Sequence, residues 1–193
     1  MLFLTRPSEA RILAFLSRQR ELTYSYPDVG STFCTPPAGY VVDHNRIPLG
    51  RGAEVFARAR EALRGWAMSR LGWVEVWPPG APVEVGTDVA LLARVLGAWA
   101  LFGCRIVRVA EERGPVEEFG FCYGTLPGHV LAGEERFAVR WDHADDSVWY
   151  DLLAYSRPSG IVARLAYPLI RRNQKRFAPE SLKAMASAVK GGR

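Results

Sequence analysis

The segment from Gly120 to Pro158 constrains the fold of this chain more than any other. It holds three strand-like runs joined by two short polar turns, and a helical period from Ser159 to Val189 follows at once. Alternation of apolar and polar residues is typical of strands with one buried face, and short turns favour antiparallel pairing. The segment therefore predicts an α+β fold in which a curved antiparallel sheet grips a long C-terminal helix and encloses a cavity.

The rest of the chain adds strands and two further helices. Strand composition occurs in four more runs, Tyr40–Leu49, Trp73–Trp77, Val83–Leu96 and Trp99–Glu111. Helical periods are found in Ser8–Arg20 and Ala53–Leu71, and Pro168 predicts a bend in the C-terminal helix. We expect one domain over residues 1–193, with an N-terminal helix and irregular arm in 1–39 and the sheet plus C-terminal helix in 40–193.

Cysteine and histidine spacing argues against a stabilising bridge or metal. The three cysteines, Cys34, Cys104 and Cys122, are far apart, odd in number and without a CxxC pair, and three histidines add no zinc spacing. We therefore expect no metal, no cofactor and a reduced, cytoplasmic compartment. The most apolar window, residues 85–109, is interrupted by charged residues, which predicts a soluble protein without a membrane span.

Positive charge is concentrated in the C-terminal helix. The formal net charge is +5, and nine basic residues but one acid, Glu180, occur from Arg157 onward. The run Arg171, Arg172, Lys175 and Arg176 predicts either the solvated outer face of an amphipathic helix or a contact with an anionic partner. No recognised motif for specific nucleic-acid binding accompanies these residues.

Five polar residues gather around one strand-to-strand connection: Tyr123, Thr125, His129, Glu134 and Glu135. We expect them at a wet rim of the cavity, where they would bind the polar head group of a ligand, because burying them without partners is costly. Glu134 and Glu135 are adjacent on a strand, so only one of them can face the cavity. The alternative is a loop shaped by Pro127-Gly128 whose polar groups satisfy its own backbone.

Four motifs in order carry a resemblance to a known family: LGRG at Leu49–Gly52, YGTLPGH at Tyr123–His129, GEERF at Gly133–Phe137 and SRP at Ser156–Pro158. With the RRNQKRF run at Arg171–Phe177, they resemble the DUF1990 (UPF0548) family over roughly residues 40–185. The order of elements resembles the helix-grip architecture of the START/Bet v 1-like superfamily. The family is of unknown function, so the resemblance implies the fold and no chemistry.

Three functions follow as hypotheses. The first is a binding module that holds a small apolar or amphipathic molecule between the sheet and the C-terminal helix, and we favour a non-enzymatic role. The second is an enzyme of the cyclase or hydrolase sort, with His129 as a proton carrier together with Glu135 or Tyr123. The third is an interaction module that uses the basic C-terminal helix on an anionic partner.

Overall fold

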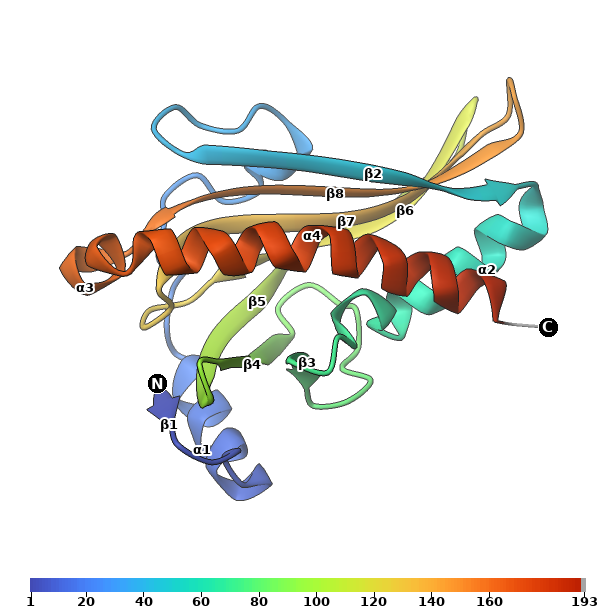
Figure 1. Ribbon diagram of the computed structural model, residues 1–193. Coiled ribbons are helices and arrows are strands. Elements are labelled where there is room, and N and C mark those ends of the chain that lie inside the picture. The colour runs from blue at the N-terminus through green and yellow to red at the C-terminus, as the bar shows by residue number, and fades with distance from the viewer. Residues whose placement is uncertain (192–193) are drawn as a thin grey trace.

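One antiparallel sheet forms the body of the molecule (Figure 1). The computed structural model describes residues 1–191, and residues 192–193, the last basic residue among them, lie outside this part of the chain. The strand order is β2-β8-β7-β6-β5-β4-β3, and β1 pairs with β5. The strands are β1 (Leu2–Phe3), β2 (Val41–Arg51), β3 (Val74–Trp77), β4 (Asp88–Val95), β5 (Ala98–Glu112), β6 (Val116–Thr125), β7 (Leu131–Asp142) and β8 (Ser147–Pro158).

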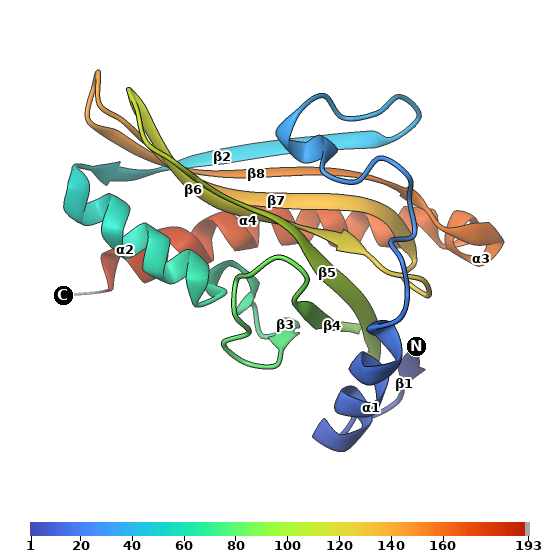
Figure 2. The same cartoon turned by 180° about the vertical axis from the view of Figure 1, so that it is seen from behind.

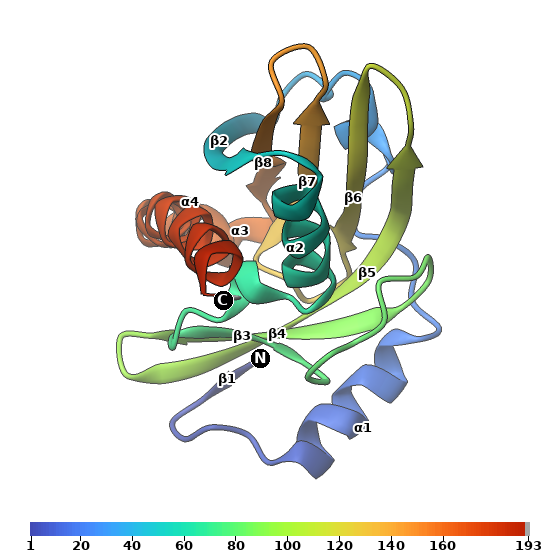
Figure 3. The same cartoon turned by 90° about the vertical axis from the view of Figure 1, so that its right-hand side faces the viewer.

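The sheet bends strongly around the C-terminal helix, as Figure 3 shows end-on. The helices are α1 (Glu9–Gln19), α2 (Ala53–Arg64), α3 (Gly160–Leu165) and α4 (Tyr167–Lys190). Both α2 and α4 lie on the concave side of the sheet, and bulges between Ile106 and Arg108 in β5 and between Pro48 and Gly50 in β2 mark where the strands bend. The predicted α+β fold, a curved antiparallel sheet around a long C-terminal helix, is confirmed.

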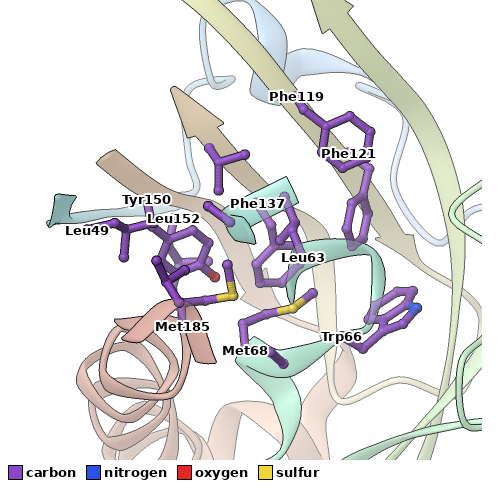
Figure 4. Close-up of a cluster of buried hydrophobic side chains, with 14 of the residues drawn as sticks. Leu49, Leu63, Trp66, Met68, Phe119, Phe121, Phe137, Tyr150, Leu152 and Met185 are labelled. Atoms are coloured by element: carbon purple, nitrogen blue, oxygen red, sulfur yellow. The ribbon is translucent and has the colours of Figure 1, made fainter. Parts of the chain in front are cut away.

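The hydrophobic core fills only part of the concave side. Side chains from α2, such as Leu63, pack with Phe121 and Phe137 of the sheet and with Met185 near the end of α4 (Figure 4). Val189, one turn further on, is also buried in this cluster. The core therefore anchors the C-terminal half of α4, while its N-terminal half covers a part of the sheet that the core does not fill.

The convex side of the sheet is covered by the N-terminal region, seen from behind in Figure 2. Ile12 and Leu16 of α1 pack on Leu92 of β4 and Leu101 of β5. The arm that follows contains a short 3-10 turn, η1 (Ser31–Phe33), and packs Tyr26 against Tyr155 of β8. Because these residues cover the convex face, strand residues on that face are buried as well as those on the concave one.

Two predicted helices differ from the observed ones. The helix expected over Ala53–Leu71 ends at Arg64, because the backbone of Trp66 turns left-handed with φ 57° and its Nε1 donates to the Ala81 carbonyl. The helix expected over Ser159–Val189 is two helices that part at Ala166. Pro168 occupies the first turn of α4, where its missing N–H leaves no intrahelical hydrogen bond unmade.

Candidate functional site

A cavity of about 380 Å³ lies between the concave face of the sheet and the N-terminal half of α4. Its walls are mainly apolar and include Leu91, Ala93, Phe102, Leu152, Ile170 and Phe177. The size and character fit small-molecule sites, which commonly measure about 300–1,000 Å³ and carry a few polar groups on apolar walls. All five of the polar residues singled out in the sequence contribute atoms to its lining, although the Glu134 carboxylate is bound by the N-terminal arm.

One cross-strand row supplies the polar groups of the concave wall. Asp43 of β2 pairs with Ala154 of β8, Ala154 with Glu135 of β7, and Glu135 with Tyr123 of β6. Paired residues in neighbouring antiparallel strands share a face, so these side chains stand side by side. The small Ala154 leaves open space between the carboxyl groups of Asp43 and Glu135.

Tyr123 and Glu135 form the central pair of this row. The Tyr123 hydroxyl donates to Glu135 Oε2 at 2.5 Å. Burial raises the pKa of Glu135 to about 7, and burial together with the charge of Glu135 raises the pKa of Tyr123 well above its usual range. The phenol therefore remains a donor, while the carboxyl group takes up or loses a proton near neutral pH.

Thr125 and Glu134 hold the N-terminal arm in place. Glu134 accepts hydrogen bonds from Tyr26 Oη at 2.8 Å, from Thr32 Oγ1 at 2.9 Å and from the backbone N–H groups of Gly30 and Thr32. Thr125 Oγ1 lies 2.7 Å from the hydroxyl of an arm serine, Ser25. The expectation of a wet rim is wrong for these side chains, because the arm supplies partners that let them be buried.

The expectation of a wet rim is also wrong for Tyr123, because its side chain is buried. Tyr123 is 5% exposed, Thr125 6% and Glu134 3%. The glycine before Glu134 shows how tightly β7 and β8 approach here: a Cβ on Gly133, whose φ is 153°, would lie 2.0 Å from the Tyr155 carbonyl oxygen. Of the five residues, Glu135 and His129 keep a half-buried position beside the cavity.

His129 is a neutral ring in this site. Burial lowers its pKa to about 4, and its Nδ1 accepts the backbone N–H of Leu131 at 2.9 Å, which places the ring proton on Nε2. The ring packs against Phe102 with centroids 4.6 Å apart and an angle of 42° between the ring planes. The imidazole is therefore uncharged near neutral pH, and Glu135 is the cavity residue whose pKa lies close to neutrality.

A second polar group, which the sequence analysis missed, ties α4 to the sheet. Arg171 donates to both carboxylate oxygens of Asp43, at 2.5 and 2.9 Å, and its Nη1 also donates to Gln174 Oε1 at 2.8 Å. The Gln174 amide donates in turn to Ser156 Oγ at 2.9 Å. The Arg171 hydrogen bonds lower the pKa of Asp43, so this carboxylate is ionised and paired. No local sequence pattern links residues so far apart.

Exposed residues of β1 and α3 contribute to the lining at one end of the cavity. Leu2 of β1 and Val162 of α3 line the cavity, yet they are 76% and 80% exposed. Their neighbours Ile161 and Leu165 on α3 are exposed to a similar extent. Leu2 and Val162 therefore place exposed apolar surface at the border of the cavity.

The basic run on α4 divides into paired and free charges. Arg171 is held by Asp43, and Arg176 pairs with Glu180 at 2.8 Å and lies over the Trp73 ring. Arg172 and Lys175 are exposed. Two of the four cations are thus engaged within the fold, as expected for the outer face of a packed amphipathic helix.

Two further features concern a metal site and a membrane-spanning helix in residues 1–191. They contain no group of three or more His, Cys, Asp or Glu side chains that could hold a metal ion. Within the same residues, no helix has the length and apolar character needed to cross a membrane.

Comparison with known proteins agrees with the motifs and the fold. A family model described as "Domain of unknown function (DUF1990)" matches residues 25–184. A UPF0548 protein of Dictyostelium discoideum is 34% identical over 203 residues, covering 95% of this chain and 94% of the relative.

Solved structures share the fold at low sequence identity. A hypothetical protein of Helicobacter pylori matches with a TM-score of 0.52 at 11% identity, covering 86% of this chain and 95% of its own. The ZhuI aromatase/cyclase of Streptomyces sp. R1128 matches with a TM-score of 0.51 at 14% identity, covering 78% of this chain and 94% of its own. These likenesses concern the fold alone.

Proposed function

The chain belongs to the DUF1990 (UPF0548) family and has a helix-grip fold of the START/Bet v 1-like kind, and from its cavity we propose that it binds a small apolar or amphipathic molecule. The observation that carries this proposal is the combination of mainly apolar walls with a polar row on the sheet, Asp43–Ala154–Glu135–Tyr123. Such a wall offers hydrocarbon contact over most of a ligand and hydrogen bonds at one place.

Physical chemistry supports an amphipathic guest over a polar one. Each methylene group moved from water into an apolar site contributes about 0.8 kcal/mol, so an alkyl chain or ring system gains steadily from the walls. A wholly polar molecule would lose its hydration against walls that are mainly apolar. The exposed apolar residues that line the cavity, Leu2 and Val162, support the same class of ligand, because they extend its apolar character to the surface.

Occupancy is tested first on the purified protein. Native mass spectrometry of freshly purified material should show a co-purified small molecule, and calorimetric titration with dodecanol should show one-to-one binding. Ala154→Leu places a larger side chain in the middle of the cavity wall, and we expect it to weaken dodecanol binding at least about tenfold because the added atoms occupy the space of the ligand.

The control carries the same change at the surface. Ala144→Leu lies in the exposed turn between β7 and β8 and should bind dodecanol as the wild type does. If Ala154→Leu lowers stability too far, Ala93→Leu fills the cavity from β4 instead. No co-purified molecule together with no dodecanol binding by the wild type would overturn the proposed function, as would undiminished binding by well-folded cavity variants.

A second candidate function is favoured by the Tyr123–Glu135 pair. A carboxyl group whose pKa is about 7 is suited to general acid–base work near neutral pH, and Tyr123 holds it in one orientation. The molecule recovered by native mass spectrometry should be incubated with the wild type and with Glu135→Gln. An unchanged mass supports a binding protein, whereas conversion by the wild type alone supports an enzyme.

A further inference from the structure

The polar row holds two carboxylates, Asp43 and Glu135, which differ in whether a positively charged side chain pairs with them. Asp43 is met by the bidentate guanidinium of Arg171. Within residues 1–191, no nitrogen of Lys, Arg or His lies within ion-pair distance of the Glu135 carboxylate, and its hydrogen-bond partner is the neutral Tyr123 hydroxyl. One carboxylate of the cavity is therefore neutralised by the fold and the other is not.

The groups that face Glu135 from the surrounding elements supply no positive charge. On the sheet these are Tyr123 of β6, Tyr150 of β8 and the Cys104 thiol of β5, and burial raises the pKa of each well above its usual range. His129 of the β6–β7 loop is neutral above about pH 4. From β2, the charge of Asp43 acts on Glu135 with the same sign, and α4 contributes Arg171, which Asp43 already binds.

The geometry at Glu135 leaves one oxygen for a ligand. Tyr123 donates to Oε2, and the hydrogen bonds within residues 1–191 include none to Oε1. The side chain is half-buried and lines the cavity. An ionised carboxylate in apolar surroundings is costly until a cation or several donors pair with it, and a hydrogen bond between charged partners is about twice as strong as a neutral one.

We propose, resting on the binding function above, that the cavity takes amphiphiles whose head group is a protonated amine, with the ammonium group donating to Glu135 Oε1 while Tyr123 holds Oε2. The apolar part of the ligand then contacts the walls formed by residues such as Leu91, Phe102 and Phe177. The ammonium group gives Glu135 a positively charged partner, as Arg171 does for Asp43.

The test compares two probes that differ only in head group, dodecylamine and dodecanol, below their aggregation concentrations. Calorimetric titration of the wild type at pH 8.5 should give dodecylamine an affinity at least about tenfold higher than dodecanol. An alkylamine has a pKa near that of lysine, about 10.4, and remains protonated. At pH 5.5 Glu135 is itself protonated, and the preference should disappear.

Glu135→Gln should abolish the preference at pH 8.5, because no carboxylate is then left to accept from the ammonium group. The matched control is Glu112→Gln, the same change at an exposed position at the end of β5, which should keep the preference. Non-specific attraction of the amine is disfavoured, because the protein has a formal net charge of +5. If Glu135→Gln does not fold, the loss of preference between pH 8.5 and 5.5 in the wild type tests the same group.

The possible results distinguish a failure of the amine head group from a failure of the proposed binding function. Equal binding of both probes by the wild type, or tighter binding of dodecanol, overturns the amine head group and leaves the proposed function standing. A preference that persists in Glu135→Gln also overturns it, because another group then recognises the amine. Binding of neither probe removes the proposed function and the inference together.

Discussion

Neighbouring glutamates in β7 show how one residue step changes a role. Glu134 points to the convex side, where Tyr26 and the backbone and hydroxyl of Thr32 satisfy its carboxylate. Glu135 points to the concave side and meets Tyr123 and the cavity. Glu134 therefore anchors the arm, whereas Glu135 is a titratable group in the cavity wall. The two carboxylates differ because successive strand residues face opposite sides.

The sequence predicts this division only in part. Adjacency on a strand establishes that one of the two glutamates faces the cavity. The choice between them depends on which face the arm covers, and the contacts that decide it join Glu134 to residues more than a hundred positions away. Asp43 was missed for the same reason: its place beside Glu135 follows from the pairing of β2 with β8 and of β8 with β7.

The pKa of Glu135 predicts a stability effect that does not depend on any ligand. An acid whose pKa is raised on folding, here from 4.5 to about 7, stabilises the folded state less as pH rises, because the folded state binds the proton more tightly. Glu135→Gln should therefore gain up to roughly 3 kcal/mol of unfolding free energy relative to the wild type at pH 8, and almost nothing below pH 4.

Urea denaturation at several pH values measures this difference. His129 acts in the opposite sense, since its lowered pKa of about 4 makes stability rise with pH between about 4 and 6.5. In Glu135→Gln this rise should become visible between pH 4.5 and 6.5, where the wild type changes less. A variant no more stable than the wild type at pH 8 would contradict the raised pKa, and Glu112→Gln serves as the unshifted control.

At the scale of elements, α4 consists of two halves with different supports. The C-terminal half is fixed by buried Met185 and Val189 and by Ser181, whose hydroxyl lies 3.1 Å from the Tyr150 hydroxyl. The N-terminal half crosses the cavity and is tied to the sheet through Arg171 and Gln174. A helix held by packing at one end and by polar contacts at the other is expected to open from the polar end.

Asp43→Asn tests this asymmetry, because it removes the charge that Arg171 binds. Both side chains are partly exposed, so we expect a local loss of about 1 kcal/mol and not a global one. Hydrogen exchange of the backbone amides in residues 169–175 should become about fivefold faster, while exchange in residues 182–189 stays unchanged.

The control for Asp43→Asn removes an ion pair elsewhere. Glu54→Gln breaks the contact with Arg58 on the exposed face of α2 and should leave both halves of α4 unaffected. Equal acceleration along the whole of α4 in Asp43→Asn, or none in its first half, would show that the Arg171 contact does not hold the helix over the cavity.

Element boundaries illustrate where sequence patterns stop being informative. The alternation in β6, β7 and β8 predicts their existence and the buried face that carries Phe119, Phe121 and Phe137. The helical period past Arg64 predicts a longer α2 than the structure has, because the residues after it remain apolar while the chain turns at Trp66 to pack on the core. A pattern of apolar residues indicates which side chains are buried, but buried side chains need not belong to a helix.

At the scale of the whole molecule, the sheet joins segments that are far apart along the chain. It runs without interruption from β2 at one edge to β3 at the other, and the main hydrophobic cluster takes residues from α2, α4 and most of the strands. Cys104 and Cys122 are buried as free thiols, and Cys34 is a free thiol at the surface. Within residues 1–191, no disulfide connects the two edges of the sheet.

This connectivity predicts one cooperative unfolding transition for residues 1–193, as a single domain would show. Far-ultraviolet circular dichroism and tryptophan fluorescence should give coincident curves in urea, since Trp66 and Trp73 belong to the region between the core and the cavity. The midpoint should be the same with chelator or reductant added, because a chain of this length buries about 70% of its unfolded surface without bridges or metal. Two separated transitions would contradict the single domain, and a lower midpoint in either additive would reveal a bridge or a bound metal.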